Sequence, residues 1–408
     1  MDGTERPDAY REALRAFAGA HITPRVPALE RAGEHPADLV RMLGAEGFFR
    51  PCVPGPDGDR DRLPVDLRYL RILIEELART GCFGLTLSVG MHAGVFLPVV
   101  ARLGADPVRE KVLDAGLRGD LLGTLAATEA DAAGSDFAGM QTAIDISDDR
   151  VVIDGHKQWI TSGAAADYAV VFGRSRPGRH PAAFSAALVP ADRDGVHREP
   201  LDMAVMRANP IGRLEFHRVE VGRDHLLGRP GRGFRYFLDH IAVERLTGAA
   251  WAVVAAEDLL AQAQQHAQAR SVGTETLWDR SAIRHRVARA AIQLALLRAL
   301  TDAAFTASHR DGQLDPFTTA ALKAAVPGAM EDVAGLCVQL QGARALTAGN
   351  PLLQALNDFR VWGVAGGSTE TMLDVVAAAF AERTTQEAAT PAGGQAGPGG
   401  RADEMTGG

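Results

Sequence analysis

A single carboxylate interrupts a stretch of the chain that otherwise suits the interior of a helix. The segment IAVERLTGAAW, residues 241–251, is apolar or small throughout apart from Glu244 and Arg245. Burying a charge is costly unless the charge is paired or used. Adjacent residues of a helix do not face each other, so Arg245 is not the expected partner. Two interpretations stand: an ion pair with another arginine, or an acid that moves a proton in a hydrophobic site.

Two polar segments earlier in the chain could bind a ligand. ATEADAAGSDFAGMQT places the hydroxyls of Thr128, Ser135 and Thr142 around Gly134, where a ligand can approach the backbone closely. GHKQWITSGAAADY places Trp159 in a strand before a glycine turn, where the indole could lie flat against a planar ligand. The structural alternatives are a capped loop leading into a strand, and a core tryptophan at the rim of a barrel.

The remaining motifs give weaker indications. GRPGRGFRYF contains Gly228, Gly231 and Gly233 with three arginines, but it matches neither Gly-x-Gly-x-x-Gly nor the P-loop pattern. We therefore expect a flexible linker into a helix. The 12 histidines lack zinc-type spacing, and no Gly-x-Ser-x-Gly motif is present. The sequence predicts no metal site.

Length and composition indicate a multidomain protein of a reducing compartment. The chain of 408 residues exceeds the roughly 250–300 residues of a single core, and its formal net charge of −8 argues against nucleic acid as a partner. Cys52, Cys82 and Cys337 are odd in number and far apart, which argues against disulfides. The charged N-terminus is unlike a signal peptide, and no run approaches the ~18 apolar residues of a membrane span. We therefore expect a cytoplasmic protein.

The elements that must position these residues form three regions and a tail. Helical spacing of apolar residues predicts an all-α domain over residues 1–121. Short strand-like runs predict a β-domain, a small barrel or sandwich, over residues 122–229. Long patterns such as PFTTAALKAAVPGAMEDVAGLCVQLQ predict a four-helix bundle over residues 230–383, and residues 384–408 read as a disordered tail. The predicted fold class is therefore α+β with several domains.

In order along the chain, four segments resemble motifs of the acyl-CoA dehydrogenase family. TEADAAGSD is similar to the family's Thr-Glu-Pro-x-Ala-Gly-Ser-Asp loop, and DGHKQWITSG to its Asn-Gly-x-Lys-x-Trp-Ile-Thr-Asn-Gly strand and turn. LLGRPGRGFRYF resembles the Leu-Gly-x-x-Gly-x-Gly-Phe segment that leads into the C-terminal bundle. QLQGARALTAGNPLLQALNDFR resembles the Gln-x-x-Gly-Gly segment with its following Pro and Arg-Asp. The resemblance covers about residues 5–383.

The resemblance implies that FAD lies between the β-domain and the C-terminal bundle. It implies that Trp159 and Thr161 contact the isoalloxazine ring, and that Thr128 and Ser135 contact the flavin or the pantetheine arm of a thioester. Since a thioester is the family's substrate, acyl-CoA or an acyl-carrier protein is the implied partner.

The resemblance also implies a cofactor site shared between subunits. Gln339 and Gly342 match positions that reach the FAD of a neighbouring subunit, which implies a homodimer or homotetramer. Arg270 matches the arginine of a phosphate-side Arg-x-x-Phe-Gly motif, and Ser368 matches a hydroxyl that contacts FAD. The implied electron acceptor is an electron-transfer flavoprotein.

The sequence departs from the family's pattern at three places. TEADAAGSD has one residue more than usual between its Glu and Gly and lacks the Pro. Gly273 and Thr274 replace the Phe and Gly that follow the phosphate-side arginine, and Ala343 replaces the second Gly of Gln-x-x-Gly-Gly. Since all three positions bear on FAD and subunit contacts, we expect a cofactor site shaped differently from the family's usual one.

The family's reaction needs a carboxylate that removes the α-proton of the thioester while the β-hydride goes to flavin N5. Most members carry it in a Tyr-Glu-Gly-Thr segment, but an ungapped alignment from Gln339 puts Gly366 at the Glu position, and Glu370 lies four residues later. A minority, the isovaleryl-CoA type and some prolyl-carrier-protein dehydrogenases, carries it in a Glu-Arg pair on the helix that opens the bundle. The resemblance therefore implies that Glu244 is the base and that the Gly366 N–H binds the thioester carbonyl.

Three functions stay open on the sequence alone. The first is dehydrogenation of an acyl thioester, which Glu244 favours. The second is a flavin-dependent monooxygenase or N-oxidase on the same fold, which lacks the usual Glu and uses reduced flavin and O₂. The third is a non-catalytic, partner-binding homologue. The sequence does not name the acyl group or decide between CoA and a carrier protein.

Overall fold

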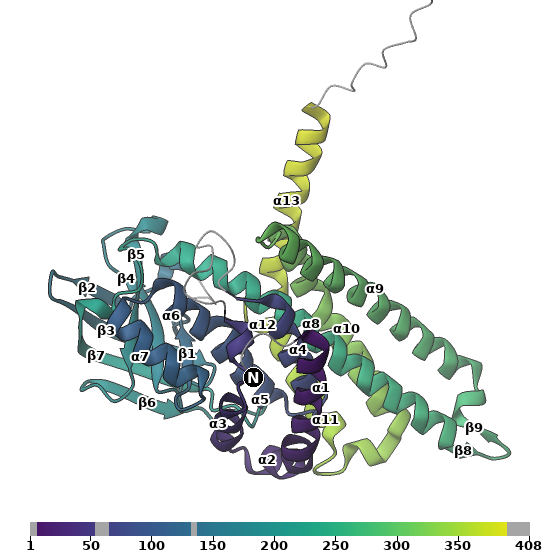
Figure 1. Cartoon of the computed structure of the whole chain (residues 1–408). Coiled ribbons are helices and arrows are strands. Elements are labelled where there is room, and N and C mark those ends of the chain that lie inside the picture. The colour runs from purple at the N-terminus through teal and green to yellow at the C-terminus, as the bar shows by residue number, and fades with distance from the viewer. Residues whose placement is uncertain (1–5, 54–64, 132–136, 390–408) are drawn as a thin grey trace, which may run out of the picture.

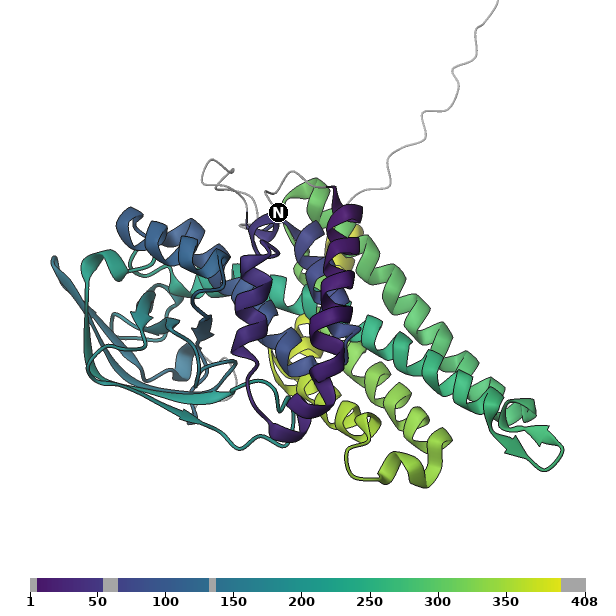
Figure 2. The ribbon, with the colours of Figure 1, turned by 60° about the horizontal axis from the view of Figure 1, so that its bottom comes forward.

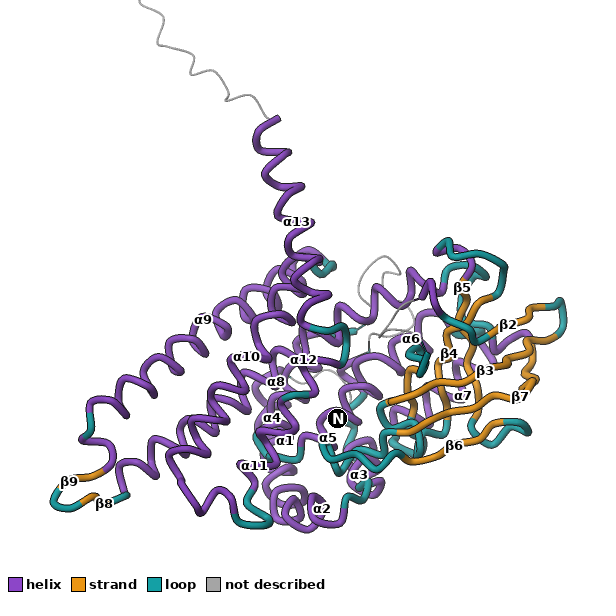
Figure 3. The backbone as a smooth tube through the Cα atoms, turned by 180° about the vertical axis from the view of Figure 1, so that it is seen from behind, coloured by secondary structure: helices purple, strands orange, loops and turns teal. Residues whose placement is uncertain are grey.

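The computed structural model describes residues 6–53, 65–131 and 137–389, which form three regions in succession along the chain. Figure 1 shows the strands on the left, the N-terminal helices at the centre and the long C-terminal helices on the right. Figure 3, seen from behind, shows the strands of the large sheet gathered at one side of the molecule. The predicted α+β class, with a helical, a β-rich and a second helical region, is confirmed.

Helices make up the first region of the described chain. They are α1 (Pro7–Phe17), α2 (Val26–Ala32), α3 (Ala37–Ala45), α4 (Leu67–Ala78), α5 (Phe83–Met91), α6 (Leu97–Leu103) and α7 (Asp106–Leu117). Asp66 caps α4 by accepting a hydrogen bond from the N–H of Arg68 at 3.0 Å. Gly33 ends α2 with a φ of +67°. Figure 2 shows the purple N-terminal helices lying in front of the rest of the helical region.

One sequence expectation about this region needs correction. The segment Phe83–Leu103, which contains α5, a π-helical turn and α6, is apolar over 21 residues with a mean hydropathy of 1.7. By length and composition it could cross a membrane, so the expectation that no run approaches this length is wrong. In this fold, however, 89% of the most apolar 18-residue stretch of this segment is buried inside the protein. A helix that is apolar all round is typical of a core helix.

Seven strands of the described chain form one sheet in the second region. They are β1 (Gly123–Ala126), β2 (Ala143–Ile146), β3 (Arg150–Ile160), β4 (Tyr168–Arg174), β5 (Phe184–Pro190), β6 (Val196–Pro200) and β7 (Gly212–Gly222). Their order is β1-β4-β2-β3-β7-β6, with β5 paired to β4. The predicted barrel or sandwich is thus a single curled sheet.

The sheet separates two apolar cores because side chains of a strand point alternately to its two faces. On β4, Val170 and Phe172 join the large core that the sheet shares with the helices. Ala169 and Val171 point the other way, into a second core enclosed by the curl of the sheet. The sheet is therefore buried on both faces along β4.

Long helices dominate the third region. They are α8 (Gly233–Ala269), α9 (Ser281–Asp311), α10 (Pro316–Gln341), α11 (Pro351–Phe359), α12 (Val361–Val364) and α13 (Thr369–Ala389), with a hairpin of β8 (Ser271–Val272) and β9 (Glu275–Thr276) after α8. Figure 1 shows α13 projecting away from the body. Because α13 runs to Ala389, helix takes in the start of the segment expected as a tail. The rest of that segment, residues 390–408, lies outside the described residues.

Aromatic packing joins the sheet to the start of α8. The ring of Phe137 contacts Phe172 of β4 and Phe184 of β5 with centroids 5.8 and 5.4 Å apart, and Phe237 of α8 at 4.8 Å. Aromatic pairs of this kind contribute about 0.5–1.5 kcal/mol beyond the area that they bury. The first turns of α8 are therefore fixed against the sheet, which sets where the next turn, with Glu244, begins.

Candidate active site

Glu244 lies on α8 and faces the turn that joins α12 to α13. Gly366 in this turn has a φ of +70°, a conformation that L-residues rarely adopt. A Cβ added at Gly366 would lie 3.2 Å from the Oε1 atom of Glu244. The carboxylate of the helix therefore occupies the space directly beside the side chain that residue 366 lacks.

Two cations hold this turn by its backbone carbonyls. The Nε atom of Arg245 donates a hydrogen bond to the carbonyl oxygen of Gly366 at 3.0 Å. The Nζ atom of Lys323 on α10 donates to the carbonyl oxygen of Gly367 at 2.9 Å and also to that of Trp362. Arg245 is thus engaged with the turn and not with its neighbour Glu244, as expected for adjacent residues of a helix.

The electrostatics of Glu244 are those of a desolvated acid with cations nearby. Burial raises the pKa of the Glu244 carboxyl, and the charges of Arg245 and Lys323 offset part of this rise. Burial lowers the pKa of Lys323 to about 8, against the opposing effect of Glu244. Within the described residues, no side chain donates a hydrogen bond or ion pair to the Glu244 carboxylate. A carboxylate with a raised pKa is a stronger base than an ordinary glutamate, which suits it to accept a proton.

An aromatic wall stands one helical turn beyond Glu244. A Cβ at Gly248 would lie 2.1 Å from the indole ring of Trp362, so only glycine fits between the helix and this ring. The Trp362 ring also lies 5.4 Å from that of Trp251 on α8. Sequence reasoning missed Trp362, because its position beside Gly248 depends on how α12 packs on α8.

Trp159 and Thr161 lie at the end of β3, where the strand departs from regular pairing. The register of β3 against β7 shifts between Lys157 and Ile160, and Trp159 has a φ of +55°. Positive φ is a costly conformation for a bulky residue. The Trp159 side chain is 52% exposed, so a large flat ring is left uncovered by the chain. Thr161, in the following turn, is half-buried.

A buried ion pair pins the Thr128 segment to β3. Lys157 donates from Nζ to Glu129 at 2.8 Å and to the carbonyl oxygen of Ala127 at 2.9 Å. The N–H of Gln158 donates to the carbonyl oxygen of Thr128 at 3.0 Å. Burial alone would raise the pKa of Glu129, but the Lys157 charge and several hydrogen bonds hold it below its usual value. The two polar segments singled out in the sequence therefore lie side by side.

One residue of the first polar segment, Ser135, lies outside the described residues.

Helix α5 connects the turn after Trp159 to the helix that carries Glu244. The hydroxyls of Ser162 and Ser88 are hydrogen-bonded at 2.8 Å, and both residues also bond the side chain of Asn209. At the start of α5, the ring of Phe83 stacks on Trp251 of α8 with centroids 5.2 Å apart. The turn after β3 and helix α8 therefore both pack against α5.

The structure places Arg270, Gln339 and Gly342 away from this site, whereas Ser368 lies next to it. Arg270 is exposed just beyond the end of α8, about 39 Å along the helix from Glu244. Gln339 and Gly342 are exposed at the end of α10. Ser368 is half-buried next to Gly367, and its hydroxyl lies 3.1 Å from that of Thr371.

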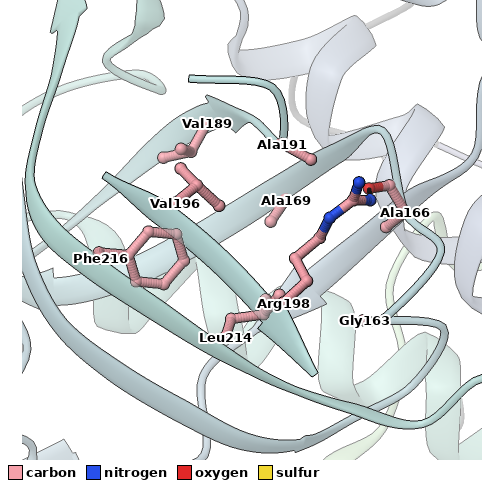
Figure 4. A pocket seen from close by; sticks show the side chains of 9 residues that line it. All are labelled: Gly163, Ala166, Ala169, Val189, Ala191, Val196, Arg198, Leu214 and Phe216. Carbon is pink, nitrogen blue, oxygen red and sulfur yellow. Dashed lines mark hydrogen bonds between the residues drawn. The ribbon is translucent and has the colours of Figure 1, made fainter. Parts of the chain in front are cut away.

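A small cavity is present in the β-region, apart from the candidate residues. Figure 4 shows its lining, which is apolar except for Arg198, whose Nη1 atom donates to the carbonyl oxygen of Ala166 at 2.6 Å. Its volume of about 10 Å³ is enough for about one water molecule and too small for an organic ligand. Because its only charged group is already paired, we assign it no ligand.

Comparison with known proteins gives matches along almost the whole chain. The N-terminal, middle and C-terminal domain models of acyl-CoA dehydrogenase match residues 4–120, 124–219 and 231–381. The long-chain specific acyl-CoA dehydrogenase of Mus musculus mitochondria is 27% identical over 373 residues, 91% of this chain and 85% of that protein.

Solved structures agree with these matches. A probable acyl-CoA dehydrogenase from Mycobacterium abscessus superposes with a TM-score of 0.83 at 26% identity, covering 93% of this chain and 100% of that one. A structure described as the FAD complex of PigA superposes with a TM-score of 0.85 at 19% identity, covering 92% of this chain and 98% of that one. At that identity the likeness to PigA concerns the fold alone.

The order of helical region, curled sheet and helical region is that of a three-domain flavin oxidoreductase. The chain belongs to the acyl-CoA dehydrogenase family, whose members use FAD and act on CH–CH bonds.

Proposed function

We propose that this protein oxidises the α,β-bond of an acyl thioester with FAD, and that Glu244 is the base. The observation that carries the proposal is the position of the Glu244 carboxylate, 3.2 Å from the point where a side chain of residue 366 would begin. The usual base position of the family is a glycine here, and a carboxylate from α8 lies beside it.

The residues of the chain divide the reaction between them. Glu244 accepts the α-proton, because burial favours its neutral form and its carboxylate has no competing partner among the described residues. The N–H of Gly366 binds the thioester carbonyl, where negative charge develops as the proton leaves. FAD, when bound, supplies the acceptor for the β-hydride. Arg245 and Lys323 hold the turn that presents this N–H.

The residues of the sheet fit an isoalloxazine ring. Trp159 offers an exposed aromatic face in a conformation that its surroundings maintain at a cost in backbone strain. Thr128 lies beside Gln158 and Thr161 directly follows β3, and we assign their hydroxyls to the polar edge of a planar ligand. Ser135 is assigned to the flavin or the pantetheine arm on the sequence resemblance alone.

We further propose that the active form is a homodimer or homotetramer. Gln339 and Gly342 would reach the FAD of a neighbouring copy, which accounts for their distance from the Glu244 carboxylate, while Arg270 is proposed for the phosphate side of FAD and Ser368 for a hydroxyl contact with it. The outer side of α9 supports this, since Ile292 and Leu296, one helical turn apart, are 61% and 69% exposed.

The substrate class and setting are finer proposals. Acyl-CoA and an acyl-carrier protein present the same pantetheine arm, so both are proposed substrates. An electron-transfer flavoprotein is the proposed electron acceptor, and the cytoplasm is the proposed location.

The experiment replaces Glu244 with glutamine, which keeps the shape of the side chain and removes the base. Purified protein loaded with FAD is mixed anaerobically with a panel of acyl thioesters, and bleaching of the flavin is followed. We expect wild type to bleach with at least one thioester, and Glu244→Gln to keep its flavin but lose about 10²–10⁴-fold in rate. Glu370→Gln is the matched control, because Glu370 is an exposed acid close to the same turn.

A Glu244→Gln variant that bleaches as fast as wild type would show that another group takes the proton. Wild type that never bleaches but consumes O₂ with reduced flavin would favour the monooxygenase or N-oxidase. A protein that stays colourless when FAD is added would favour the non-catalytic homologue.

A further inference from the structure

The chain uses lysine sparingly, and two of its lysines are buried. It contains three lysines, Lys111, Lys157 and Lys323, among 43 basic residues of the Lys and Arg types. Lys111 is exposed, whereas Lys157 and Lys323 are 0% and 2% exposed. Lysine is rarely fully buried without a partner. In a chain that mostly places arginine at its basic positions, two of the three lysines are therefore the buried ones.

Lys157 has a carboxylate partner, whereas Lys323 has none among the described residues. Lys157 forms an ion pair with Glu129 at 2.8 Å. The hydrogen bonds given for the Lys323 ammonium in the described residues go to two backbone carbonyl oxygens, those of Trp362 and Gly367. No carboxylate of the described chain lies within ion-pair distance of it. The lysine is therefore placed to close a turn of backbone and not to neutralise a side chain.

The turn that Lys323 closes carries Gly366. The two carbonyls that it binds lie on either side of this glycine in the sequence. The Cε atom of Lys323 would lie 3.7 Å from a Cβ at Gly366, and Oε1 of Glu244 would lie 3.2 Å from the same point. The Cε atom of Lys323 and the Oε1 atom of Glu244 therefore both lie beside the side of Gly366 that has no side chain.

The charged groups that face Lys323 come from α8 alone among the described residues. Glu244 favours its charged form and Arg245 opposes it. From the turn it meets only the two carbonyl dipoles, and from α12 the indole of Trp362, whose ring centroid lies 5.9 Å from Nζ. A charge at this position acts on the Glu244 carboxylate through little intervening water.

We propose that Lys323 is a positioning residue for the dehydrogenation proposed above: its ammonium fastens the 362–367 turn so that the Gly366 N–H and the Glu244 carboxylate face the same thioester. The inference rests on the proposed function. Arginine is not expected to replace it, because the guanidinium is larger than the ammonium group and presents its donors in a fixed planar fork.

The test compares Lys323→Met, Lys323→Gln and Lys323→Arg with wild type in anaerobic flavin bleaching over a range of pH. Lys111→Met is the matched control, since Lys111 is the exposed lysine. We expect Lys323→Met to lose about 10–100-fold in the limiting rate, because the turn moves relative to the base. We also expect the acid limb of the pH profile, where the bleaching rate falls as pH drops, to move up by about one pH unit. The reason is that a positive charge near Glu244 has been removed. The Gln variant, which has a donor but no charge, should show the same shift with a smaller loss of rate.

The Arg variant separates charge from shape. It keeps a positive charge, so its acid limb should stay at the wild-type position, while its rate should still fall at least about tenfold. This variant decides the matter if the uncharged variants fail to retain FAD.

Each contrary outcome has a definite meaning. A Lys323→Met variant with wild-type rate and limb overturns the role of Lys323. A lower rate with an unmoved acid limb also overturns it, because the lysine would then be structural only. An Arg variant with the wild-type rate refutes the requirement for lysine. Wild type that bleaches with no thioester overturns the proposed function, and the role of Lys323 falls with it.

Discussion

The surroundings of Glu244 and the outer side of α9 stand in sharp contrast. Around Glu244, the charged side chains are buried or half-buried and each cation donates to a backbone carbonyl, so the geometry is fixed within one chain. In the most apolar 18 residues of α9, only 33% of the residues are buried. Ile292, Leu296 and Leu300 are exposed there at intervals of four residues. A stripe of this spacing lies on one side of the helix.

The contrast separates what one chain supplies from what it leaves open. The proposed proton transfer needs only α8, α10 and the turn after α12, all of which the chain holds together. The proposed FAD contacts of Gln339 and Gly342 lie at exposed positions about 24 Å or more along α10 from Lys323. We infer that a single chain has its base in place but an incomplete cofactor site.

The largest effect is expected from charges placed on the exposed side of α9. Ile292→Asp with Leu296→Asp places two charges on the exposed stripe of α9, where an apolar contact between copies would have to bury them. Contacts at the centre of an interface carry most of the binding energy, so we expect the assembly to fall to monomers in sedimentation experiments. The bound FAD should then be lost, and with it the activity.

Arg286→Asp is the matched control for this prediction. It lies exposed on the same helix and changes the net charge by the same amount as the two aspartates together. An assembly that persists in the double variant, or an active monomer, would remove the argument that the cofactor site is shared.

A smaller effect is expected from Gly366→Ala, which tests the surroundings of Glu244. Alanine at a φ of +70° costs about 1–2 kcal/mol, and its Cβ would lie 3.2 Å from Oε1 of Glu244. We expect the carboxylate to be displaced and the rate of flavin bleaching to fall by about 10–100-fold while FAD stays bound.

Gly363→Ala is the control for this change. Gly363 is close by in the chain, but a Cβ there would meet nothing nearer than 3.9 Å. If the two alanine variants behaved alike, the space beside Gly366 would not matter to the reaction.

Much of the fold could be predicted where local signals are strong. The segment singled out as a bundle helix, residues 316–341, is α10, because Asp315 caps its start and Gly342 ends it. Strand β6 was not predicted, since most of its residues are exposed and VHREP shows no alternation. It is held in the sheet by its pairing with β7, a contact that the local sequence does not encode.

The site was predictable in part for the same reason. Glu244 could be singled out because a charge in an apolar helix is visible in the sequence, and the glycine at residue 366 is equally visible. Lys323 was not singled out, because its role arises from carbonyls of a turn about forty residues later. A sign was nevertheless present: a lone lysine within an apolar helix of a chain that mostly uses arginine.

The claim that Glu244 is the base is tested most directly by the pH dependence of flavin bleaching in wild type and in Glu244→Gln. A base must be deprotonated to act, so the rate falls as pH drops through its pKa in the folded protein. Burial raises this pKa above the ordinary value of 4.5. We therefore predict a wild-type acid limb centred above pH 4.5 that is absent from the residual rate of Glu244→Gln. The same acid limb in both proteins would contradict the account.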